Sequence, residues 1–82
     1  MKIKTILRHR GLTLPQYAAL RSARRGPLHR VAATWRERGS RDAIRTPAIE
    51  AIAAKGLLEI QERTAVLTDA GARMLRELEG RR

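Results

Sequence analysis

Arginine is the residue type in this chain best suited to chemistry, and the chemistry that it suits is the binding of phosphate. Fifteen of the 18 basic residues are Arg, and the formal net charge is +10. The planar guanidinium matches phosphate oxygens better than the point charge of Lys does. Residues 1–45 hold 12 basic and 2 acidic residues, whereas residues 46–82 hold 6 of each. We therefore expect a polyanion to bind the N-terminal half, although a basic surface can also serve only solubility.

Three residues are candidates for contact with the edges of DNA bases: Arg41, Arg45 and Thr46. They surround the expected start of a helix at Thr46, and the first residues of a recognition helix reach base edges in helix-turn-helix proteins. The alternative is that either arginine forms an ion pair with Asp42 or Glu50.

A second group consists of arginines expected to contact the phosphate backbone. The first four lie near an expected turn between two helices, the next two near the end of the second helix, and the last in a ribbon turn. A solvated helix end accounts equally well for Arg36 and Arg38. The members are Arg21, Arg24, Arg25, Arg30, Arg36, Arg38 and Arg63.

No pattern of residues indicates catalysis. His9 and His29 lack a Cys or carboxylate at metal-ligand spacing, and no Ser-His-Asp set or Gly-rich phosphate loop is present. We expect no enzyme activity, no cofactor and no metal. Trp35 could stack on a base, but its place in an apolar stripe favours the core.

Helical signals dominate the first two thirds of the chain. The segment 2–10 suits a short helix, with a strand as the alternative. Thr13-Leu14-Pro15-Gln16 fits a capping box that begins a helix ending near residue 24. Leu28, Val31, Ala32 and Trp35 follow at i, i+3, i+4 and i+7, which predicts a second helix from Gly26-Pro27 to Gly39. Residues 40–45 then read as the tight turn of a helix-turn-helix, before a third helix over residues 46–55.

The segment 55–75 predicts a helix end, a two-stranded ribbon and a new helix. Gly56 suits the left-handed conformation that ends a helix. Leu57, Leu58 and Ile60 form one expected strand and residues 65–67 the other, across a turn at residues 61–64. Thr68 can cap the last helix. The chain shows no internal repeat. We expect a mainly α fold with a two-stranded β-hairpin wing, a winged helix-turn-helix, as a single domain over residues 1–82 with its core at 11–78 and flanking arms at 1–10 and 79–82.

Several motifs together resemble the DNA-binding core of MarR-type winged helix-turn-helix transcription regulators. They are the segment 11–20, Gly26-Pro27-Leu28, Lys55-Gly56-Leu57-Leu58 and Val66-Leu67-Thr68-Asp69-Ala70-Gly71. The resemblance implies binding to double-stranded DNA, sequence-tolerant or sequence-specific, by a bacterial or phage transcription regulator. The wing is shorter than in that family and keeps only Arg63. The long terminal helices through which the family dimerises have no counterpart, so a homodimer is possible but is not implied by the resemblance.

Two alternatives remain open. The outward positions Pro47, Glu50, Ala51 and Ala54 of the third helix offer no bidentate donor to a base, so this face could instead dock a protein partner. The Arg content also permits association with RNA or the ribosome. The chain has no Cys and no apolar run of about 20 residues, so we expect a soluble cytoplasmic protein on the nucleoid, without membrane contact.

Overall fold

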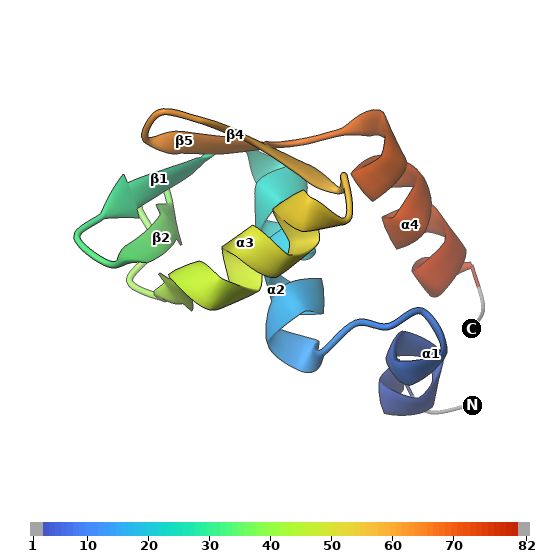
Figure 1. Cartoon of the computed structure of the whole chain (residues 1–82). Helices are drawn as coiled ribbons and strands as arrows, with labels where there is room; N and C mark the ends of the chain where they lie inside the picture. Colours follow the sequence, from blue (N-terminus) through green and yellow to red (C-terminus); the bar gives the residue numbers. More distant parts are fainter. Residues whose placement is uncertain (1–2, 81–82) are drawn as a thin grey trace.

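The computed structural model describes residues 3–80 and contains four helices and five strands in that range (Figure 1). In chain order they are α1 (Ile3–His9), α2 (Leu14–Arg25), β1 (Leu28–Val31), β2 (Thr34–Glu37), β3 (Ile44–Arg45), α3 (Thr46–Ala54), β4 (Leu58–Gln61), β5 (Thr64–Leu67) and α4 (Asp69–Glu79).

The strands form one antiparallel sheet in the order β3-β2-β1-β5-β4, so the fold is α+β. The expected mainly α fold with a two-stranded wing is therefore wrong. The ribbon expected at residues 57–67 is present as β4 and β5, with a shorter turn than expected, but it forms only one edge of a larger sheet.

The error lies in residues 28–39, where a helix was expected and the hairpin β1–β2 is found. The helical spacing of four apolar residues predicts one buried helix face. In the structure only Leu28 and Trp35 are buried, and Val31 and Ala32 are exposed. A two-residue turn at Ala32 and Ala33, with Ala32 at φ 56°, brings Leu28 and Trp35 to the same face of the sheet. Val, Thr and Trp also fit a half-buried strand better than a helix.

Residues 40–45 do not form the tight turn of a helix-turn-helix. Ile44 and Arg45 pair with Trp35 and Thr34 as strand β3, at the edge of the sheet. The chain therefore passes from α2 to α3 through three strands, and the two helices are not joined as a helix-turn-helix requires.

Other local predictions are confirmed. Thr13 and Gln16 form the capping box of α2, and Gly56 has φ 77° at the end of α3. The Thr68 hydroxyl accepts a hydrogen bond from the Gly71 N–H at 3.0 Å and caps α4. Thr46, by contrast, is the first residue of α3, and the N-cap is Arg45, whose side chain makes no capping bond.

The two β-hairpins of the structure are equivalent in geometry, although their sequences are not recognisably repeated. The hairpins β1–β2 and β4–β5 match at an offset of 30 residues, and each follows a helix and a glycine. Both have two-residue turns whose first residue has positive φ, Ala32 and Glu62. In both, a threonine hydroxyl donates to the carbonyl that begins the turn, from Thr34 to Val31 and from Thr64 to Gln61, each at 3.0 Å. The fold thus places two equivalent ribbons side by side.

The core lies between one face of the sheet and the helices. Leu28, Trp35 and Ala65 from the sheet are buried together with Leu20 of α2 and Ile52 of α3. α1 and α4 pack at the far end, away from the two hairpin turns (Figure 1). The opposite face of the sheet, which we call the outer face, is not covered by a described helix. Trp35 is 2% exposed, which confirms its expected place in the core.

Candidate nucleic-acid interface

The strand register identifies the residues that share the outer face. His29 pairs with Arg36 on one side and with Thr64 on the other. Neighbours in a strand point to opposite faces, and the partners of Leu28 face the core, so His29 and its partners face outward. Arg45 and Val31, which both pair with Thr34, form a second row on this face.

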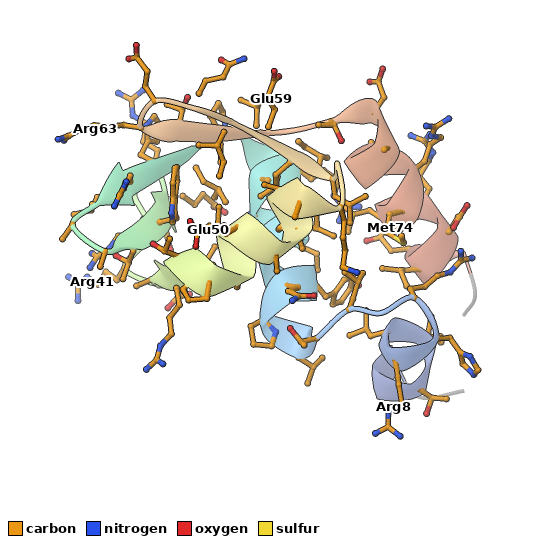
Figure 2. All side chains as sticks on the ribbon, viewed as in Figure 1. Arg8, Arg41, Glu50, Glu59, Arg63 and Met74 are labelled. Carbon is orange, nitrogen blue, oxygen red and sulfur yellow. The ribbon has the colours of Figure 1, made fainter. Side chains whose placement is uncertain are left out.

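The two hairpin turns extend this surface at one end of the sheet. The Arg30 N–H donates to the Arg63 carbonyl at 2.8 Å and thereby joins the first ribbon to the turn of the second. The Thr46 hydroxyl donates to the Ala33 carbonyl at 2.7 Å and ties α3 to the first turn. Figure 2 shows Arg41 and Arg63 at this same end. We call His29, Arg36, Arg45 and Arg63 the basic face. Arg30 pairs with Trp35, so its side chain leaves the sheet on the opposite side.

Three arginines outside this surface form ion pairs with carboxylates. Arg10 pairs with Glu77 at 3.0 Å, Arg24 with Glu79 at 2.6 Å and Arg25 with Glu37 at 2.8 Å. The hydrogen bond with Glu79 raises the pKa of Arg24 above its ordinary value. Of the expected phosphate ligands, Arg24 and Arg25 are therefore engaged within the protein.

Arg21 is held differently, with its guanidinium 5.6 Å from the centre of the Tyr17 ring on α2. It lies on α2 and lines the same groove as Arg45 of the basic face.

The arginines of the basic face have no carboxylate partner among the described residues. Arg30, on the other side of β1, also has none, and its Nε–H donates to the Ala32 carbonyl at 3.2 Å. The Arg36 Nε is buried without an acceptor, and Arg45 and Arg63 are exposed. Arg38 and Arg41 are exposed in the loop between β2 and β3, also without an ion pair. Arg8 on α1 and Arg73 and Arg76 on α4 are also exposed without an ion pair in the described range, so what distinguishes the hairpins is that their unpaired arginines lie together on one side of the sheet.

The three residues expected to contact bases do not present their side chains together on one surface. Arg45 is on β3, on the outer face, and Arg41 is in the preceding loop. The Thr46 hydroxyl is already bonded to Ala33, so it is not available to a base in this conformation. Glu50, Pro47 and Ala54 are exposed on α3, and Figure 2 shows Glu50 on this helix.

Sequence reasoning missed the polar neighbours of the arginines on the outer face: His29, Thr34, Gln61 and Thr64. Each is placed there by pairing between strands. One indication of this is present in the sequence: His29 and Arg30, in the stretch His29-Arg30-Val31, are polar residues inside the segment expected to form a helix with a buried face.

A second surface feature is an open groove of about 890 Å³ between α2, the β2–β3 loop and the start of α3. Its apolar lining comes from Pro15, Ala18, Ile44, Pro47 and Ala48. Arg21, Arg45 and the Arg25–Glu37 ion pair supply charge at the same groove. The small side chains make it wide and shallow, unlike an enclosed ligand site.

Within residues 3–80, no three His or acidic side chains gather where they could hold a metal ion. None of the helices described has the length and apolar character needed to cross a bilayer. Comparison of the chain with protein-family models, with curated proteins and with solved structures finds no match.

Proposed function

We propose that this protein binds double-stranded DNA through the basic face. The observation that supports the proposal is the gathering of unpaired arginines on one side of the sheet. Arg36, Arg45 and Arg63 have no carboxylate partner among the described residues and lie on or beside the outer face. Arg10, Arg24 and Arg25 are in ion pairs. Arg8, Arg73 and Arg76, which have no ion pair within residues 3–80, lie on α1 and α4, at the far end of the molecule (Figure 1). Phosphate contacts from such arginines release counterions and supply affinity.

The chemistry of the basic face favours a duplex over unpaired strands. Single-stranded nucleic acids are bound by aromatic side chains on which bases stack. The outer face of the described sheet has no Phe, Tyr or Trp, because Trp35 is buried in the core and Tyr17 lies on α2, and His29 is its single aromatic ring. A two-stranded ribbon fits the major groove of B-DNA, and the chain presents two ribbons side by side.

The acidic residues of the sheet indicate the orientation. Glu59 projects from β4, at the edge farthest from β3 (Figure 2). Arg45 lies on β3 and Arg36 on β2, at the other side of the sheet. The second turn also carries the exposed Glu62, next to Arg63. We therefore expect the backbone of DNA to run over β1, β2 and the first turn, with Arg63 at the margin of the contact.

A role in transcription regulation is supported only by the resemblance to MarR-type regulators. The residues that this resemblance assigned to a helix-turn-helix fold differently here, so the expected reading of bases shifts to the hairpins. Arg45 and Arg63 are the side chains that we expect to reach guanine edges, since bidentate contact with guanine is the commonest specific contact of arginine.

The experiment is a fluorescence anisotropy titration of the full chain on a random-sequence duplex, repeated over a range of salt concentrations. Four phosphate contacts by arginine predict a slope of about −4 for log K against log[salt]. Single-stranded DNA and structured RNA serve as competitors. A flat salt dependence, or tighter binding of RNA than of duplex DNA, would contradict the proposal.

A charge-matched pair of variants locates the site. R45A/R63A removes two arginines of the basic face, and R73A/R76A removes two exposed arginines of α4. Both lower the net charge by two, so a general charge effect changes both equally. We expect the first variant alone to lose about two units of salt slope. Equal losses in the two variants would place the DNA elsewhere.

A second candidate function is docking of a protein partner in the groove between α2 and α3. Pro47, which the sequence assigned to a docking face, lines this groove together with Ala48 and Ala18. The small lining would accept an apolar helix face. Ala48→Arg would block such docking and leave the basic face intact, so a partner that is lost by this variant while DNA binding persists would support the second function.

A further inference from the structure

The two edges of the sheet differ. At one edge, the two-residue strand β3 covers part of β2 through Ile44 and Arg45. At the other edge, β4 has β5 on one side and no described strand on the other. Ile60 on this strand is 40% exposed although it is a large apolar side chain. An uncovered edge presents unpaired N–H and C=O groups to another strand.

The hydrogen-bond pattern shows which groups of β4 are unpaired. In a hairpin with a two-residue turn, the closing pair exchanges both hydrogen bonds, and the pairs alternate from there. In β4–β5 the closing pair is Gln61 and Thr64, so the backbone groups of Ile60 and Leu58 point away from β5.

The first hairpin provides a direct precedent for using these groups. Arg30 is the counterpart of Ile60 at the offset of 30 residues, and its backbone also points away from its own hairpin. The Arg30 N–H is bonded to the Arg63 carbonyl of the neighbouring ribbon. The same position in the second ribbon has no such neighbour among the described residues.

We propose that β4 is a dimerisation strand, which pairs antiparallel with β4 of a second copy about a twofold axis at Ile60. The paired edges would join two five-stranded sheets into one continuous sheet. The proposal does not depend on DNA binding.

The register follows from the side chains. A pair centred on Ile60 sets the two Ile60 side chains against each other and covers their exposed surface. It also sets Glu59 opposite Gln61 of the second copy, a pair without charge repulsion. A pair centred on Glu59 would oppose two carboxylates, which destabilises a sheet, and Glu59 turns its backbone toward β5. A pair centred on Leu58 would set Ile60 opposite Gly56 and leave its apolar surface exposed.

The strength of the dimer should depend on salt. Each copy carries a formal net charge of +10, so two copies repel at low ionic strength. The pairing strand has only four residues, so it has little area to offset this repulsion. We expect self-association to increase with salt, and to reach its maximum at about 1 M, where the screening length is about 3 Å.

Cysteine cross-linking tests the register because the chain has no native Cys. The Cα atoms of a hydrogen-bonded antiparallel pair lie about 5.5 Å apart, which a disulfide can span. The test variant is I60C. The matched control is V31C, since Val31 is also a half-exposed apolar residue, at 49%, but lies on an inner strand. Both are oxidised without DNA, in about 1 M salt.

We expect I60C to form disulfide-linked dimers about tenfold faster than V31C, because pairing raises the local thiol concentration. Equal rates would overturn the proposal. A second measurement is sedimentation equilibrium of I60P and I60K, each checked for folding by circular dichroism. Proline at Ile60 removes an N–H that the monomer does not use, and lysine places like charges at the axis. Both should be monomeric, and a variant that is folded yet still self-associates would also overturn the proposal.

Because these measurements contain no DNA, their failure leaves the proposed DNA binding untouched. Conversely, loss of DNA binding with cross-linking retained would reject the DNA proposal alone.

Discussion

Substitution of Gly71 by alanine should destabilise the protein strongly, although alanine is the better helix former. Gly71 lies in the first turn of α4, where the helix meets the base of the β4–β5 ribbon. A Cβ at this position would overlap the backbone carbonyl of Leu57 and come within 2.7 Å of Leu67 Cδ1. The Leu67 side chain can rotate, but the Leu57 carbonyl cannot move without the strand.

The size of the effect follows from two opposing contributions. Overpacking of this kind costs about 1–3 kcal/mol, and a clash with backbone belongs at the upper end. Replacing glycine by alanine in a helix returns up to about 1 kcal/mol. The net loss is then about 2 kcal/mol. Relief by moving α4 would also expose Leu75 and Leu78, which are 0% and 2% exposed.

The measurement is the free energy of unfolding in urea, together with the melting temperature. A domain of this size loses about 4–8 °C for each kcal/mol, so we expect a decrease of about 8–16 °C. Gly26→Ala is the control, since its backbone is extended and a Cβ there has no neighbour within 4 Å. The control should stay within about 0.5 kcal/mol of the parent. If G71A is as stable as G26A, the packing of α4 on the ribbon described here is incorrect.

Three further predictions concern single contacts. Thr68→Ala removes a hydroxyl that caps α4 and also donates to the Gly56 carbonyl at 2.6 Å; it should cost about 1–2 kcal/mol in urea unfolding, whereas Thr68→Ser should retain most of the stability. The single Trp35 should emit at short wavelength and resist acrylamide quenching until the protein unfolds, because its side chain is 2% exposed; a red-shifted, readily quenched signal in the native state would contradict its burial. Glu77→Gln breaks the ion pair with Arg10, but Glu77 is 51% exposed, so the loss should be below about 1 kcal/mol and vanish in high salt; a large, salt-independent loss would not fit a surface pair.

Local sequence patterns predict the structure correctly where a residue type has a single structural role, such as capping a helix. Thr13 with Gln16, Gly56, and Thr68 each fix a helix end through a short-range hydrogen bond or a left-handed backbone, and the structure has all of them. The alternation around the second ribbon also identified its two strands. These features depend on residues close together in the chain, so the sequence contains the information.

The segment 28–39 could not be assigned in this way. Leu28, Val31 and Trp35 satisfy the spacing of an amphipathic helix, yet Leu28 and Trp35 also satisfy the alternation of a hairpin. The choice is made by partners distant in the chain: Ala65 and Thr64 pair with β1, and Ile44 and Arg45 pair with β2. Strand β5 of the second ribbon offers backbone hydrogen-bonding groups to β1, and this pairing favours a strand over a helix for the segment.

For the candidate interface, the sequence determined the supply of arginine and its excess in the first 45 residues. It did not determine which arginines are available to a ligand. Arg24 and Glu79 are 55 residues apart and meet at 2.6 Å only because α4 packs beside α2. Arg36 and Arg45 lie on the same outer face because the strands that carry them, β2 and β3, pair in one sheet. Charge is a property of the composition, but the pairing of charges is decided by which elements come into contact, and that is a property of the tertiary structure alone.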